Sequence, residues 1–244
     1  MKIGKYTIDN IYLADSYEAI KELPSKCLDC IYTDIPYLYK ISKQTKYKNT
    51  VDKNIAEKKN SIFEISNGIR YEILDEFVQV LKKINIFIWC SRSQISKIMQ
   101  YFESKGCTAE ILVWCKTNPQ PSTRNTWLPD IEYCLYFREQ GVKLNDGYEL
   151  KHKWYMSSIN KKDKARFLHP TCKPVELIQR HLMHATSKGD IVGDFFCGSG
   201  STCVACINTD RHYLAFDNNP KWVEIAINRI KGIDANGVQC LLAG

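Results

Sequence analysis

The sequence predicts one α/β domain, in which a mostly parallel sheet of seven strands carries helices on both faces. Three observations support this prediction. Short runs rich in β-branched and aromatic residues are apolar throughout rather than alternating, as in strands covered on both sides. Stretches with a helical spacing of apolar residues lie between many of these runs. No repeat, heptad pattern or linker divides the chain, so residues 1–244 are expected to form a single domain.

The predicted strands are recognised by their apolar runs, and in chain order they cover 10–15, 28–34, 84–90, 109–116, 131–138, 190–196 and 212–217. The runs 109–116 and 131–138 have no helical stretch between them. An antiparallel pair at the edge of the sheet is therefore expected there.

The predicted helices are amphipathic stretches with recognisable starts, at 16–22, 71–83, 173–186 and 219–230, with a further helix after a glycine-rich turn near residue 200. Asp15 is expected to cap the first of them. Asn219 is expected to cap the last, with Pro220 at its first helical position.

Composition limits the class of protein. The chain is 44% hydrophobic, as in ordinary globular proteins, and it has no apolar run long enough to span a membrane. The first residues, "MKIGKYTIDN", do not resemble a secretory signal, and the eleven cysteines are an odd number. We therefore expect reduced thiols, a cytoplasmic location and no membrane partner.

Two long segments, 38–70 and 139–170, show no clear secondary-structure pattern, and both are basic. Residues 40–59 hold seven lysines and two acids. The second segment interleaves lysines with His152, Trp154 and Tyr155. Basic segments with aromatic side chains suit a phosphate backbone and exposed bases, although charge alone also fits two solvated loops.

The strongest chemical signal is the stretch "DIVGDFFCGSGST" at 190–202. A buried strand ends at Asp194 and is followed by Gly198 and Gly200, and then by a helix start. The next strand ends in Asp217. Glycines allow a ligand to approach the backbone, and an acid at this place commonly binds ribose hydroxyls. The pattern predicts a ligand that contains adenosine, although a purely structural glycine turn is an alternative.

The stretch departs from two better-known nucleotide motifs. Cys203 stands where the dinucleotide fingerprint has its third glycine, and no Walker lysine follows the turn. A nucleoside triphosphate is therefore not expected.

Three motifs together resemble one enzyme family, the S-adenosylmethionine-dependent DNA amino-methyltransferases. "DFFCGSGST" resembles their cofactor motif, "DIPY" at 34–37 their catalytic Asp-Pro-Pro-Tyr, and "HPTCKP" at 169–174 the block before the cofactor motif. The catalytic motif comes first and the cofactor motif last, which resembles the β class. The resemblance covers nearly the whole chain and implies a Rossmann-like methyltransferase fold with permuted motif order.

In this family the turn acts on an exocyclic amine. The resemblance implies that Asp34 and the carbonyl of Ile35 accept hydrogen bonds from adenine N6, that Tyr37 stacks on a flipped-out base, and that Pro36 stiffens the turn. The amine lone pair then becomes available for attack on the methyl group of the cofactor. An acid at the first motif position favours adenine, since serine there is commoner in cytosine-N4 enzymes.

The resemblance also implies a set of residues that bind S-adenosylmethionine. Phe196 and Gly198 are expected near its methionine part, with Gly200 in the same turn and Lys173 nearby. Asp194 is expected to contact its amino group, Asp217 the ribose, and Asp15 the adenine. These cofactor candidates are Asp15, Lys173, Asp194, Phe196, Gly198, Gly200 and Asp217.

Partners follow from the same resemblance. DNA is the expected substrate, with 38–70 as a mobile basic loop that closes over it and 139–170 as a short target-recognition insertion. Related enzymes of the β class often dimerise, which makes a homodimer an expectation. The role of Arg124 is left open between phosphate and the cofactor region.

Several alternatives stay open. Ile35 replaces the usual proline, so a subunit that binds nucleic acid without catalysis is one of them. Cytosine-N4 methylation of DNA and adenine methylation of RNA use the same chemistry. A zinc site is not expected, because Cys30, Cys203 and Cys206 of the two Cys-x-x-Cys pairs fall in a strand and a helix and are interpreted as buried apolar residues. Protein glutamine methyltransferases have the opposite motif order.

Overall fold

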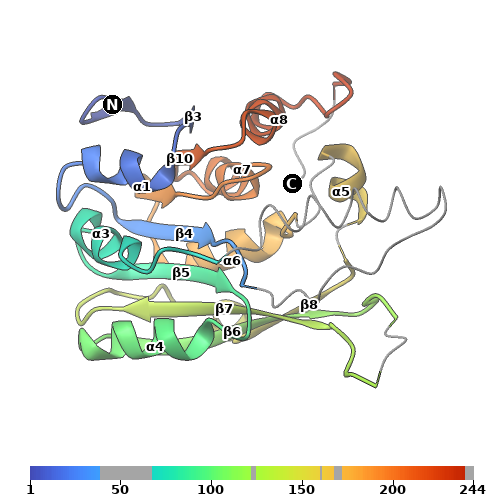
Figure 1. Cartoon of the computed structure of the whole chain (residues 1–244), viewed down its shortest axis with the longest axis horizontal. Coiled ribbons are helices and arrows are strands. Elements are labelled where there is room, and N and C mark those ends of the chain that lie inside the picture. The colour runs from blue at the N-terminus through green and yellow to red at the C-terminus, as the bar shows by residue number, and fades with distance from the viewer. Residues whose placement is uncertain (39–67, 122–124, 160, 168–171, 240–244) are drawn as a thin grey trace.

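A computed structural model describes residues 1–38, 68–121, 125–159, 161–167 and 172–239. Within these ranges one eight-stranded sheet has the order β3-β10-β9-β4-β5-β7-β6-β8 (Figure 1). Its strands are β3 (Asn10–Leu13), β4 (Cys30–Asp34), β5 (Asn85–Cys90), β6 (Thr108–Lys116), β7 (Ile131–Arg138), β8 (Trp154–Ser157), β9 (Ile191–Asp194) and β10 (His212–Asp217). A separate antiparallel pair joins β1 (Lys2–Ile3) to β2 (Tyr6–Thr7).

The mostly parallel sheet is confirmed, and each of the seven predicted runs contains a strand. β3, β10, β9, β4 and β5 pair in parallel, so their carboxyl ends lie at one edge of the sheet. β7 runs antiparallel between β5 and β6. The sheet therefore continues past the five parallel strands through one reversed strand.

One detail of the prediction is wrong. The antiparallel pairing of 109–116 with 131–138 is present, but the pair does not form the edge, because an eighth strand, β8, pairs in parallel with β6. β8 comes from the segment 139–170, for which no strand was predicted. Its four residues, "WYMS", are too few to show a strand pattern in the sequence.

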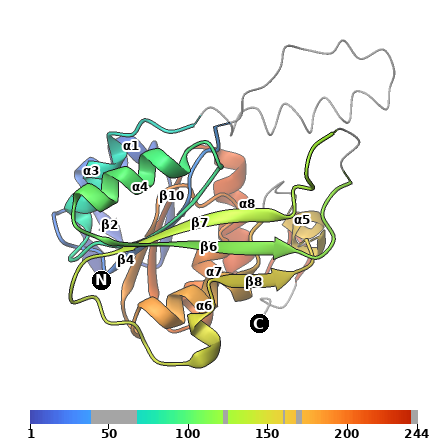
Figure 2. The ribbon, with the colours of Figure 1, turned by 90° about the horizontal axis from the view of Figure 1, so that it is seen from below.

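Helices cover both faces of the sheet, as predicted (Figure 2). One face carries α1 (Ser16–Ala19) with the 3₁₀ turn η1 (Ile20–Glu22), α3 (Ile73–Val80) and α4 (Ile95–Ser104). The other face carries α6 (Val175–Ala185), α7 (Ser201–Asn208) and α8 (Pro220–Ile230). The remaining short elements are η2 (Tyr148–Lys151) and α5 (Lys161–Phe167).

Two apolar clusters fill the space between the helices and the sheet. Along β5, Ile86 and Ile88 join the cluster under α3 and α4, whereas Phe87 and Trp89 join the cluster under α6 and α7. All six residues of β5 are buried. This two-sided burial is the reason that its sequence is apolar from Ile86 to Cys90.

The predicted helix starts are confirmed where a cap could be recognised. The Asp15 carboxylate accepts a hydrogen bond from the Tyr17 N–H at 2.8 Å, and Asn219 accepts one from the Lys221 N–H at 3.0 Å. Pro220 is the first residue of α8, also as predicted. In the part of the chain that the structure describes, no helix is long and apolar enough to cross a membrane.

Candidate active site

Four aspartates meet at the carboxyl edge of the parallel strands. Asp34, Asp194 and Asp217 are the last residues of β4, β9 and β10, and Asp15 follows two residues after β3. Because β9 lies between β10 and β4, the glycine-rich turn after β9 is adjacent to the Asp-Ile-Pro-Tyr turn after β4. The fold therefore brings together the two motifs that lie far apart in the sequence.

The Asp-Ile-Pro-Tyr turn is fixed to β5 and to the start of α4. The Ile35 N–H donates to the Trp89 carbonyl at 3.2 Å, and the Ile35 side chain is buried. The buried Gln94 amide donates to the Pro36 carbonyl at 3.1 Å, and its oxygen accepts from the Leu38 N–H at 3.3 Å. Gln94 thus holds the backbone of the turn at Pro36 and at Leu38. No sequence motif indicated this role.

Asp34 presents two carboxylate oxygens in different environments. Oδ2 pairs with the ammonium group of Lys173. Oδ1 is buried and has no hydrogen-bond donor among the described residues. Burial raises the pKa of Asp34, while the Lys173 charge opposes that rise. A buried acceptor with no donor is costly in a folded protein, and such atoms mark places where a ligand completes the hydrogen bonding.

Lys173 lies at the Asp-Ile-Pro-Tyr turn. Its ammonium group contacts Glu132 Oε2 at 3.1 Å and the Tyr37 hydroxyl at 3.2 Å, in addition to Asp34. Burial alone would lower the pKa of Lys173, but the carboxylates of Asp34 and Glu132 raise it above its usual value. The lysine is therefore a permanent cation between two acids.

Glu132, on β7, is a second residue that the sequence analysis missed. Its Oε1 pairs with Lys116 at 2.6 Å, and its Oε2 faces Lys173. Burial favours the neutral acid, but the two lysines prevail and lower the pKa of Glu132 to about 2. Two carboxylates and two ammonium groups thus form a charge-balanced cluster of Asp34, Lys173, Glu132 and Lys116.

Asp194 is the buried acid at the head of the glycine-rich turn. Its Oδ1 accepts hydrogen bonds from the Thr33 hydroxyl at 3.1 Å and from the Phe196 N–H at 3.2 Å. Burial raises the pKa of Asp194 to about 7, and these hydrogen bonds oppose the rise. Its ionised form would gain from a cationic ligand at this position.

The glycine-rich turn is joined to the next strand. The Gly198 N–H donates to Asp217 Oδ2 at 2.8 Å, and the Asn219 N–H donates to Oδ1 at 2.9 Å. Gly200 has a φ of 76°, and a Cβ there would lie 3.0 Å from the Cβ of Ala226 on α8. Gly200 is thus required both for the backbone conformation and for the contact between the turn and α8.

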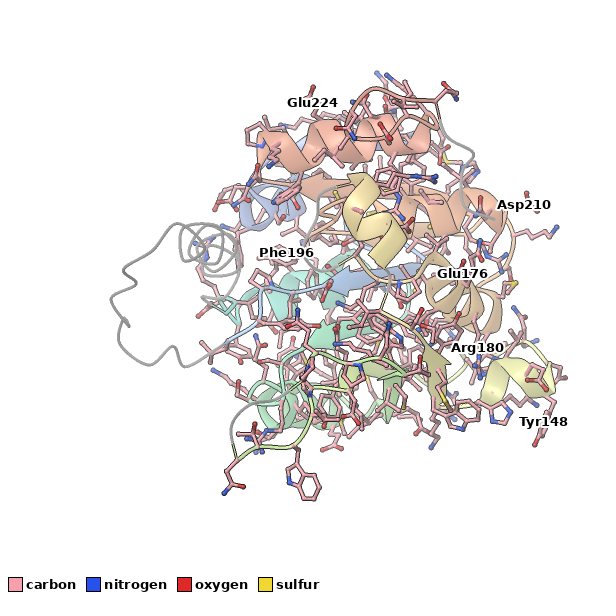
Figure 3. The ribbon with its side chains drawn as sticks, turned by 90° about the vertical axis from the view of Figure 1, so that its right-hand side faces the viewer. Tyr148, Glu176, Arg180, Phe196, Asp210 and Glu224 are labelled. Carbon is pink, nitrogen blue, oxygen red and sulfur yellow. The ribbon has the colours of Figure 1, made fainter. Side chains whose placement is uncertain are left out.

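Aromatic residues border this edge near α1. The ring of Phe196 (labelled in Figure 3) meets the ring of Tyr17 edge to face, with 6.1 Å between centroids. The guanidinium group of Arg70 lies 3.8 Å from the centroid of Tyr17 and 4.0 Å from the Asp15 carboxylate. Asp15, the cap of α1, therefore faces the same edge as Phe196.

Some expectations concern residues outside the described ranges, namely 39–67 of the basic loop, Arg124 and His169. The cysteines Cys30, Cys203 and Cys206 are buried among apolar side chains, as predicted. Across the ranges that the structure describes, no group of three or more His, Cys, Asp or Glu side chains could hold a metal ion.

Comparison with known families gives a match over most of the chain. The family model described as DNA methylase, for N6 and N4 methylases, matches residues 28–228. The type II methyltransferase M2.DpnII of Streptococcus pneumoniae is 27% identical over 240 residues, covering 89% of this chain and 88% of that protein. The type II methyltransferase M2.MboI of Moraxella bovis is 25% identical over 241 residues, covering 90% and 86%.

Solved structures share the fold. The M1.HpyAVI–SAM complex has a TM-score of 0.68 at 23% identity and covers 90% of this chain and 98% of its own. The cytosine-N4-specific PvuII DNA methyltransferase has a TM-score of 0.67 at 16% identity and covers 98% and 92%. At these identities the likeness concerns the fold alone.

Proposed function

Because the chain belongs to the DNA methylase family, we propose that it transfers a methyl group from S-adenosylmethionine to the N6 amino nitrogen of adenine in DNA. The observation that carries this proposal is the buried Oδ1 of Asp34 beside the glycine-rich turn, an acceptor for which the described residues supply no donor. Adenine N6 is a donor of the kind that this atom lacks. The curated relatives are type II methyltransferases, and the proposal assigns the chain to the same restriction–modification class.

The acceptors and backbone groups at this edge suit the cofactor. S-adenosylmethionine supplies an electrophilic methyl group on a sulfonium, and its remaining polar groups include a cationic amine and ribose hydroxyls. Asp194 would hold the amine, Asp217 the ribose and Asp15 the adenine, beside the backbone of Gly198 and Gly200. Phe196 would lie against the methionine part. The three carboxylates, which accept hydrogen bonds and favour cations, match this set of donors.

The turn after β4 would prepare the base. Asp34 Oδ1 and the Ile35 carbonyl would accept the two N6 hydrogens, which draws the nitrogen towards tetrahedral geometry and frees its lone pair. Tyr37 would stack on the flipped-out base, and Pro36, held by Gln94, would keep the carbonyl in place. Because a backbone carbonyl does not depend on the side chain, Ile35 serves here as well as proline. Positioning and electrostatics then supply most of the rate enhancement.

Adenine is proposed over cytosine because an acid opens the motif. Cytosine-N4 methylation is the second candidate, since the PvuII enzyme, which is cytosine-N4-specific, shares the fold. The basic segments 38–70 and 139–170 remain the proposed DNA contacts, the second as the target-recognition segment. Arg180 on α6 (labelled in Figure 3) ties the second segment to that helix by donating to the Trp154 and His152 carbonyls.

The test is transfer of labelled methyl groups to DNA, with RNA as a second substrate, followed by analysis of the modified nucleosides. N6-methyladenine in DNA is expected from the wild type, and no incorporation from Asp34→Ala. Asp75→Ala, an exposed acid on α3, is the matched control and should label DNA normally. N4-methylcytosine, methylated RNA alone, or binding without transfer would each contradict the proposal in favour of an alternative.

Sequencing of the methylated positions would identify the target site. The proposed homodimer is tested separately, by the mass of the purified protein in solution.

A further inference from the structure

A single buried ammonium group joins both ends of the Asp-Ile-Pro-Tyr turn. Lys173 is 4% exposed, and its Nζ contacts Asp34 Oδ2 and, at 3.2 Å, the hydroxyl of Tyr37. The acid and the ring that the proposed reaction requires are thus bound to one cation. Any movement of Lys173 would change the orientation of both.

Lys173 is itself held in place from β7. Glu132 Oε2 lies 3.1 Å from Nζ of Lys173 and accepts a hydrogen bond from the Tyr37 hydroxyl at 3.4 Å. Its other oxygen is occupied by Lys116, at the end of β6. Glu132 is therefore fixed at both oxygens, and the position of Lys173 is set by strands that carry none of the predicted motifs.

This arrangement distinguishes the two oxygens of Asp34. With Oδ2 bound to Lys173, the carboxylate has little freedom to turn, and Oδ1 is the oxygen for which the described residues provide no donor. A fixed acceptor lowers the activation free energy more than a freely rotating one, because it does not have to reorganise when the base arrives. Without the ammonium group, either oxygen could face the base, and the two acids would repel each other.

We propose that Lys173, held by Glu132, is a positioning residue that orients Asp34 and Tyr37 towards the base, rather than a ligand of the cofactor. This inference rests on the proposed methyl transfer and adds two residues to it. It predicts that loss of Lys173 lowers kcat and leaves the affinity for S-adenosylmethionine nearly unchanged. A cofactor ligand would show the opposite pattern.

The first experiment compares Lys173→Met with Lys188→Met, which removes an exposed lysine that pairs with Asp210 outside the proposed DNA-binding segments. Methyl transfer to DNA and S-adenosylmethionine affinity by calorimetry are measured for both. For Lys173→Met we expect kcat to fall by about 100-fold, the cost typical of a misplaced reacting group. Its affinity for the cofactor should stay within about threefold of the wild type, and Lys188→Met should match the wild type in both.

A second experiment tests the link to Glu132. Glu132→Gln should lower kcat by about tenfold, whereas Asp210→Asn, which changes the partner of the control lysine, should not. In the Lys173→Met background, Glu132→Gln should cost little more, because residues that act through one another are not additive. The pH profile gives a further readout. Loss of the Lys173 cation should move the acid limb of kcat to higher pH, since Asp34 loses the charge that stabilises its ionised form.

The outcomes separate this inference from the proposed function. A wild type that methylates no DNA refutes the function. An active wild type with a Lys173→Met variant equal to Lys188→Met refutes the inference. Cofactor affinity lost in Lys173→Met, or a greatly lowered Tm in both Lys173→Met and Glu132→Gln, also refutes it, because the lysine would then bind the cofactor or stabilise the fold.

Discussion

The hydroxyl of Thr33 donates a hydrogen bond of 3.1 Å to the carboxylate of Asp194. Thr33 precedes Asp34 on β4, and Asp194 ends the neighbouring strand β9. The bond therefore joins the strand that presents the Asp-Ile-Pro-Tyr turn to the strand that presents the glycine-rich turn. Both residues are buried, so the distance between the two turns is set by the rigid centre of the sheet.

Thr33→Val should weaken cofactor binding without unfolding the protein. Valine has nearly the same shape, but the Asp194 carboxylate loses a donor that favours its ionised form. A hydrogen bond to a charged group contributes on the order of 1 kcal/mol or more, so we expect at least about fivefold weaker binding of S-adenosylmethionine. Calorimetry would measure this, with Thr108→Val, an exposed position on β6, as control. Unchanged affinity would show that the bond has no effect on the cofactor site.

Cofactor affinity should depend on pH through Asp194. Its pKa is raised to about 7 by burial, and only the ionised form attracts the cationic amine of S-adenosylmethionine. The affinity for S-adenosylmethionine should therefore rise with pH up to about 7 and level off above it. Below pH 7 the affinity should fall by up to about tenfold for each pH unit. Titrations between pH 5.5 and pH 8.5 test this. Asp194→Asn should bind weakly with little dependence on pH, whereas a wild type with flat affinity would contradict the assignment.

The same carboxyl should influence the stability of the protein without cofactor. Its folded pKa of about 7 lies above the reference value of 3.8, so the folded state binds this proton more tightly than the unfolded state. The resulting stabilisation is complete below about pH 4 and is lost as the pH rises through 7. At pH 8, Asp194→Asn should thus have a higher free energy of unfolding than the wild type, by on the order of a few kcal/mol, as measured by urea unfolding. The difference should shrink towards pH 5, and the reverse trend would exclude a raised pKa.

Gly200→Ala should destabilise the fold and disturb the cofactor turn. The backbone at Gly200 has a positive φ, which L side chains rarely adopt. A new Cβ there would also lie 3.0 Å and 3.3 Å from two atoms of Ala226 on α8. Gly106→Ala is a matched control, because Gly106 has the same φ of 76° and no heavy atom within 4 Å of its Cβ position. Gly106→Ala should lower the free energy of unfolding only by the cost of a left-handed backbone at alanine, about 1–2 kcal/mol. Gly200→Ala should lower it by about 1–3 kcal/mol more, because its Cβ is also crowded. Equal losses in urea unfolding would show that the contact with α8 is unimportant.

The sequence predicted most of the sheet because its central strands are buried on both faces. Such strands are apolar at most positions on both faces, which makes β4, β5, β9 and β10 visible as nearly continuous apolar runs. The helix caps Asp15 and Asn219 were also recognisable, since a cap requires only a local hydrogen bond. By contrast, α4 was not predicted, although Ile95, Ile98 and Phe102 repeat at a helical spacing.

Elements that depend on distant partners were missed. β8 is short and pairs only with β6, so nothing local in residues 154–157 requires an extended backbone. α5 is a seven-residue, mostly polar helix in a lysine-rich stretch, and its Phe167 packs on Trp222 and Ile225 of α8. Short segments of this kind gain their structure from tertiary packing rather than from intrinsic propensity.

The sequence by itself determined the fold class, the two turns that follow β4 and β9, and the acids that end these strands. These features are local, because a buried run, a glycine pair or an acid beside a proline can be recognised from neighbouring residues alone. Only the tertiary structure decided what surrounds Asp34. Lys173 contacts it because α6 packs under the sheet, and Glu132 reaches Lys173 because β7 is inserted in reverse between β5 and β6. Electrostatic contacts act through space, and the spacing of residues along the chain does not encode them.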